Sequence, residues 1–91
     1  MNRKIRIMMV VTSREGQGLK HIYKEYESEM IPMAGMKLED CGLKEPVEII
    51  SVTCNIENNI YYIDLPVIEM ETKESCDSYV ESMKHHDWKE N

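Results

Sequence analysis

The stretch VEIISVTCNIENNIYYIDLPV, residues 47–67, decides the fold because it predicts a β-hairpin. Asn58 and Asn59 stand between two alternating apolar runs, and asparagine tolerates the positive φ that a two-residue hairpin turn requires. Around that turn, apolar residues face one another on one side: Ile56 with Tyr61, Cys54 with Ile63, Val52 with Leu65, and Ile50 with Val67. The other side is largely polar, so the pattern predicts one buried face and one solvent-facing side.

An amphipathic helix is predicted after the hairpin, over about residues 73–85. Thr72 is suited to cap its N-terminus, and Glu74 places a negative charge in the first turn, where the helix dipole favours it. The apolar residues recur at helical spacing and form one stripe: Cys76, Tyr79, Val80 and Met83. We expect this stripe to pack on the apolar face of the hairpin.

The residues before the hairpin predict less regular structure. Residues 30–39 are typical of a short strand with an irregular entry, since Pro32 cannot donate to a β-ladder and Gly35 suggests a bend. Residues 40–46 predict a loop.

The N-terminal residues 4–12 predict a strand that lies centrally in a sheet. One side is apolar throughout (Ile5, Ile7, Met9 and Val11), and the other side becomes apolar halfway along. With the hairpin and the C-terminal helix, this strand predicts an α+β fold. We expect a small antiparallel sheet or partly closed barrel, with the helix packed on it.

Residues 19–29 fit two structures. Leu19, Ile22, Tyr23 and Tyr26 recur at helical spacing, which favours a second helix. The rival is a strand that folds back on the first one. In that strand Lys24 interrupts the apolar side between Ile22 and Tyr26, so the helix is the preferred prediction.

Length and composition bound the class of protein. The chain has 91 residues, enough for one domain over residues 1–91 with a modest core. Its three cysteines are widely spaced and imply no disulfide framework, so a reducing, cytoplasmic compartment is expected. No apolar run approaches transmembrane length, and no membrane association is expected. Because a small core with an open strand edge often completes its burial by self-association, we expect a homo-oligomer.

Charge is distributed unevenly along the chain. Residues 1–24 carry six basic side chains and one acidic one, whereas residues 25–91 carry five basic and sixteen acidic ones. The net charge of −6 argues against direct nucleic-acid binding, which requires a basic face.

The basic N-terminal part contains a candidate anion site. A strand followed by a glycine-rich loop is the general setting of phosphate-binding sites. The candidate ligands for a small anion such as a nucleotide are Thr12, Ser13, Arg14, Gly16, Gly18 and Lys20. The spacing matches no established nucleotide motif, and the alternative is a mobile turn.

The acidic part contains a candidate protein-binding surface. Spaced carboxylates can occupy the basic groove of a partner, and an exposed tyrosine can anchor an interface. The candidate residues are Tyr62, Glu69, Glu71, Glu74, Asp77 and Glu81. Ordinary solubilising charge is the alternative interpretation.

Catalytic and metal-binding patterns are weak. The histidines and cysteines lack metal-ligand spacing, and no metal or cofactor is expected. Cys41 with His21 as its base is the one candidate for a small enzyme of unknown reaction. In size and acidity the chain resembles small intracellular proteins of bacteria, their phages and mobile elements, through no shared motif. The sequence therefore favours a non-enzymatic binding protein, an inhibitor or adaptor, with anion sequestration as the alternative.

Overall fold

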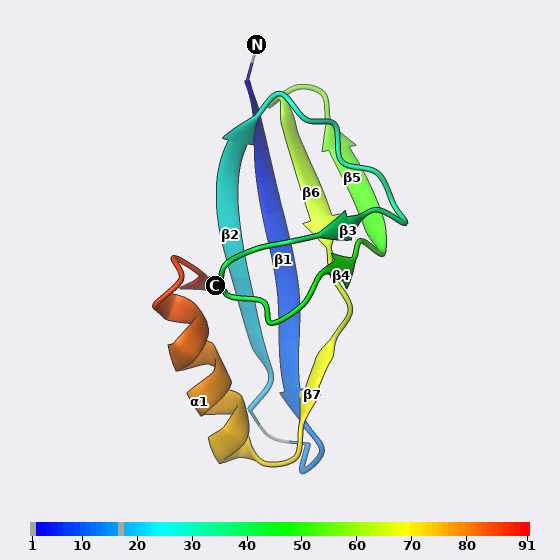
Figure 1. Cartoon of the computed structure of the whole chain (residues 1–91). Coiled ribbons are helices and arrows are strands. Elements are labelled where there is room, and N and C mark those ends of the chain that lie inside the picture. Colours follow the sequence, from blue (N-terminus) through cyan, green and yellow to red (C-terminus); the bar gives the residue numbers. More distant parts are fainter. Residues whose placement is uncertain (1, 17) are drawn as a thin grey trace.

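The computed structural model of the chain describes residues 2–16 and 18–91. Its elements, in chain order, are β1 (Arg3–Ser13), β2 (Lys20–Ser28), β3 (Lys37–Leu38), β4 (Val47–Glu48), β5 (Ser51–Asn55), β6 (Ile60–Asp64), β7 (Ile68–Met70), α1 (Lys73–Lys84) and β8 (Lys89–Glu90). In Figure 1 the helix lies at one end of a twisted sheet, and an irregular segment carrying β3 and β4 crosses in front of the strands. The predicted α+β class is confirmed.

Strand β1 is central, as the sequence predicts. Its apolar side is almost fully buried, with exposed fractions of 7% or less at Ile5, Ile7, Met9 and Val11. β1 pairs antiparallel with β2 on one side, and on the other it pairs in parallel with β6 and then with β7. The strand order is β5-β6-β1-β2-β8, so the sheet is mixed and has two edges.

This topology corrects the predicted antiparallel sheet or partly closed barrel. The long connection over residues 29–50 returns the chain across the sheet, so that β6 arrives beside β1 in the same direction. β7 then continues that direction along the remaining length of β1. A barrel would require β5 and β8 to pair, but they are the two opposite edges of the strand order.

Residues 20–28 form strand β2, so the preferred helix over residues 19–29 is wrong and the rival strand is correct. Along the covered face, Ile22 pairs with Met9, and Lys24 pairs with Ile7. Lys24 is buried despite its charge. Pairing along almost the whole length of β1 outweighs the local helical stripe, because tertiary burial overrides intrinsic propensity.

The hairpin is present, but its register differs from the predicted one by two residues. Cys54 pairs with Tyr61, and Val52 pairs with Ile63. The turn spans residues 56–59, with Asn59 at a φ of +53° and the Asn58 N–H donating to Asn55 Oδ1 at 3.1 Å. A two-residue shift keeps every side chain on its face, so alternation alone cannot distinguish the two registers.

The predicted C-terminal helix is confirmed. The Thr72 hydroxyl accepts a hydrogen bond from the Ser75 N–H at 3.0 Å and caps the N-terminus. Cys76, Val80 and Met83 are buried. The helix does not pack on the hairpin, however; it lies against β1, β7 and β8.

The covered face of the sheet is therefore shared by two different segments. The helix covers the end of the sheet near β7, and the segment carrying β3 and β4 covers the end near the hairpin (Figure 1). Trp88, just after the helix, is buried in the same core. Within the described residues, no helix is long and apolar enough to cross a membrane.

Candidate functional site

An apolar groove of about 350 Å³ opens where residues 29–50, the crossing segment, lie over the sheet. The sheet contributes Ile5, Ile7 and Ile63 to its lining. The crossing segment contributes Met30, Pro32, Met36 and Leu38, and the remaining lining residues are Tyr26, Glu27, Ser28, Lys37, Glu39 and Ile49. The lining is mainly apolar, and its charged residues are Glu27, Lys37 and Glu39.

Local backbone geometry holds the crossing segment in place. Gly35 has a φ of +91°, which favours glycine, and its N–H donates to the Ile49 carbonyl at 2.9 Å. The Ile49 N–H in turn donates to the Met36 carbonyl at 2.8 Å, next to the short β3–β4 pair. Met30 and Met36 thus line the groove while remaining exposed to solvent.

A buried polar cluster lies beside the groove and is centred on Asp40, whose side chain is 0% exposed. Four groups donate to its carboxylate. They are Lys24 Nζ at 2.8 Å, Trp88 Nε1 at 2.9 Å, the Gly42 N–H at 2.8 Å and the Tyr26 hydroxyl. The cluster therefore ties together β2, the loop after β3 and the residues that follow α1.

Gly42 lies at a closely packed position between the helix and the Asp40 carboxylate. A Cβ atom there would lie 3.1 Å from Met83 Sδ, 3.2 Å from Asp40 Oδ2 and 3.2 Å from His86 Cβ. A side chain at residue 42 would therefore require these neighbours, the Asp40 carboxylate among them, to shift by a few tenths of an ångström.

The ionised forms of Asp40 and Lys24 stabilise each other. Burial opposes the charge on Asp40, but hydrogen bonds from Lys24, Tyr26, Trp88 and Gly42 outweigh it and hold the pKa of the carboxyl well below its usual range. Burial likewise opposes the charge on Lys24, but bonds with Asp40 and Tyr26 raise the pKa of the ammonium above its usual value. Burial first, and then the bond to Asp40, raise the pKa of Tyr26.

These shifts predict how stability depends on pH. The contribution of Asp40 is complete above its ordinary pKa of 3.8 and is lost as the pH falls below it, because folding favours the deprotonated form. The contribution of Lys24 is complete below pH 10.5 and is lost as the pH rises beyond it.

Urea unfolding between pH 2 and pH 7 tests the role of Asp40. The free energy of unfolding should fall more steeply towards acid pH in the wild type than in Asp40→Asn. Equal slopes of unfolding free energy against pH would contradict a stabilising role of the Asp40 carboxylate.

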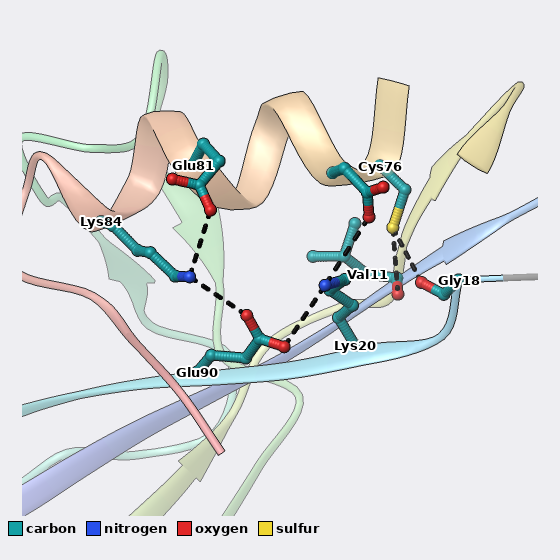
Figure 2. A network of polar contacts seen from close by, with 8 residues as sticks. Val11, Gly18, Lys20, Cys76, Glu81, Lys84 and Glu90 are labelled. Atoms are coloured by element: carbon teal, nitrogen blue, oxygen red, sulfur yellow. Dashed lines mark hydrogen bonds and ion pairs between the residues drawn. The ribbon is translucent and has the colours of Figure 1, made fainter. Parts of the chain in front are cut away.

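The candidate anion loop is held by acidic side chains. Arg14 Nε lies 2.8 Å from a Glu69 carboxylate oxygen. Lys20 Nζ lies 3.3 Å from Glu90 and 3.6 Å from Asp77 (Figure 2). Both predicted cations are thus already paired with carboxylates.

The rest of that loop is shaped by turns and helix contacts. Gly16 and Gly18 have positive φ angles of 77° and 82°. The Gly18 carbonyl accepts from the Cys76 thiol at 2.9 Å, and Ser13 is buried at the end of β1. Thr12 pairs with Glu69 of β7. The loop is therefore fastened to β7 and to the start of α1.

The predicted acidic residues fall into two groups, three on α1 and two, Glu69 and Glu71, before it. Glu74, Asp77 and Glu81 share one side of α1, as their spacing requires. A chain of ion pairs runs from Glu81 through Lys84, Glu90 and Lys20 to Asp77 and joins α1, β8 and β2 (Figure 2). Glu71, just before the helix, is exposed, and Glu69 pairs with Arg14.

Tyr62 lies on the opposite, uncovered face of the sheet. There Arg6 stacks between two tyrosines, with its guanidinium carbon 4.9 Å from the Tyr23 ring centroid and 6.0 Å from that of Tyr62. Arg6 also forms an ion pair with Glu25 at 2.8 Å. Tyr62 therefore does not join the helix carboxylates in one surface.

Cys41 and His21 are not brought together. Lys24 Nζ lies 3.7 Å from Cys41 Sγ on the covered face, whereas His21, three residues earlier in β2, points to the uncovered one. Among residues 2–16 and 18–91, no three His, Cys, Asp or Glu side chains are grouped to hold a metal ion.

No family model, curated protein or solved structure matches the chain. Function is therefore inferred from the geometry of the described residues. Sequence reasoning missed the groove, Lys24 and Asp40. The available signals were the Asp-Cys-Gly turn at residues 40–42, and Lys24 itself, which breaks an otherwise apolar strand pattern.

Proposed function

We propose that this protein is a small non-enzymatic binding protein, an adaptor or inhibitor, that holds a basic, amphipathic segment of a partner protein in the methionine-lined groove. The observation that carries the proposal is an apolar groove that remains open to solvent in a chain with a small core. Its volume is at the lower end of the range of about 300–1,000 Å³ typical of ligand sites. Exposed methionines are typical of surfaces that adapt to apolar side chains.

The expected chemistry of the partner follows from charge. Glu27 and Glu39 line the groove and outnumber its one lysine, Lys37, and the chain has a net charge of −6. A partner segment with apolar residues flanked by Lys or Arg would bury its apolar part and meet carboxylates at the margin. The carboxylates of α1 would add long-range attraction for the same basic partner. The alternative, a nucleotide or other small anion at the Arg14–Lys20 loop, has less support, because both cations are engaged by carboxylates.

The test is selection from a displayed library of random 12-residue peptides. We expect the enriched peptides to combine apolar and basic residues and to perturb the NMR signals of residues 26–38. Met36→Asp should weaken their binding at least about tenfold, because a carboxylate enters the apolar lining. Met33→Asp is the matched control, since Met33 is exposed in the same segment but does not line the groove.

Two outcomes would contradict the groove. One is equal binding to Met36→Asp and to the wild type. The other is loss of binding on the triple replacement of Glu71, Glu74 and Asp77 by Lys, with Met36→Asp unaffected. The second result would assign the partner to the acidic helix face instead.

A further inference from the structure

The two edges of the sheet are protected very differently. At one edge, β8 has only two residues, Lys89 and Glu90, and both are charged. At the other edge, β5 pairs with β6 on one side, and no strand of the described chain pairs with its other side. Residues 50–56, ISVTCNI, contain no charged side chain, although charged residues make up 31% of the chain.

The free edge also carries exposed apolar side chains. Ile50 is 55% exposed and Ile56 is 86% exposed, at the two ends of β5, and Cys54 between them is exposed as well. Soluble proteins usually protect an edge strand with lysine, proline, a bulge or a covering segment. An uncharged edge flanked by exposed isoleucines is a template for another strand.

We propose that β5 pairs antiparallel with β5 of a second copy, about a two-fold axis at Thr53, so that one sheet runs through both protomers. In this register Ile50 faces Ile56 of the second copy, and Val52 faces Cys54 of the second copy, on one side of the sheet. Ser51 faces Asn55 of the second copy on the other side, and Thr53 faces itself. Each side is thus self-complementary, as a two-fold interface requires.

Charge supports a second copy as the occupant. The nearest carboxylates along the strand are Glu48 and Glu57. In the Thr53-centred register they fall opposite Asn58 and Ile49 of the second copy, so no like charges face each other. Two copies of an acidic protein therefore meet at a place free of charge. Shifting the axis to Val52 or Cys54 breaks the pairing of Ile50 with Ile56.

The contact is small. It joins only two five-residue strands and their flanking isoleucines, so we expect it to bury less than the roughly 1,000 Å² typical of stable interfaces. We therefore expect a dissociation constant on the order of 10 µM. The inference is independent of the proposed function, because none of residues 50–56 lines the groove.

The first experiment is cysteine cross-linking in a background with Cys41→Ser and Cys54→Ser, which removes the two exposed thiols. Residues facing each other across antiparallel strands have Cα atoms about 4.5–5.5 Å apart, which is within disulfide range. Thr53→Cys should give a covalent dimer under mild oxidation. Glu57→Cys, exposed in the adjacent turn, is the matched control and should give little. Equal cross-linking of the two variants would overturn the register.

The second experiment needs no engineered thiol. Sedimentation of the reduced wild type should show a mass that rises with concentration up to about 200 µM, above the expected dissociation constant. Thr53→Lys should remain monomeric, because it places two ammonium groups face to face on the axis, while Glu57→Lys should behave as the wild type does. A wild type that is monomeric throughout, or a Thr53→Lys variant that still dimerises, would overturn the proposal.

Discussion

Replacing Asp40 with alanine is expected to lower the free energy of unfolding by about 3–5 kcal/mol, a large part of the 5–15 kcal/mol typical of a whole domain. The substitution leaves the Lys24 ammonium, whose side chain is only 8% exposed, without its carboxylate partner. It also removes the acceptor of the Trp88 indole and of the Gly42 N–H. Urea unfolding followed by far-UV circular dichroism measures the loss.

Two further variants identify the cause of that loss. Lys24→Met in the Asp40→Ala background should restore part of the stability, because it removes a buried charge that has lost its partner. If Lys24→Met destabilises the Asp40→Ala variant by as much as it destabilises the wild type, the two residues are not coupled. Glu69→Ala is the matched control: it breaks the exposed pair with Arg14 and should cost less than about 1 kcal/mol.

The same ion pair explains why the sequence predicts β2 incorrectly. Lys24 lies between Ile22 and Tyr26 on what would be the buried side of a strand, and a buried lysine counts against a strand when no partner is known. Its partner, Asp40, lies 16 residues further along, in a segment that the sequence predicts only as a loop. A single sequence does not show that two distant polar residues compensate each other.

The hairpin shows a second limit of alternation. The apolar pattern predicts one buried side, and Ile63 and Leu65 are buried there. Four residues of the same predicted side are exposed, however: Ile50, Cys54, Ile56 and Val67. The pattern does not determine the register, because shifts by two residues preserve the faces. Nor does it determine what covers the apolar face: the crossing segment lies at the hairpin end, and the helix packs near β7. The groove arises from that arrangement, so it could not be predicted from local patterns.

Local sequence patterns do not predict the C-terminal strand β8 either. β8 has only two residues, and neither is apolar, so no pattern marks it as a strand. It pairs with β2 because Asp87 turns the chain at a φ of +68° and the Trp88 side chain enters the core. The chain's only tryptophan is thus the anchor that returns the tail to the sheet.

Replacing Trp88 with alanine is therefore expected to cost about 3–5 kcal/mol, because a large side chain that is only 2% exposed leaves a cavity against the helix and the Asp40 loop. Trp88→Phe should cost about 1–3 kcal/mol, since a smaller ring keeps much of the packing but gives up the bond to Asp40. Leu19→Ala, at an exposed position, should stay within about 0.5 kcal/mol of the wild type in the same urea titrations. If Trp88→Ala unfolds within about 1 kcal/mol of the wild type, the residues after α1 are not part of the cooperative core, and their contacts with β2 are too weak to hold the Asp40 cluster together.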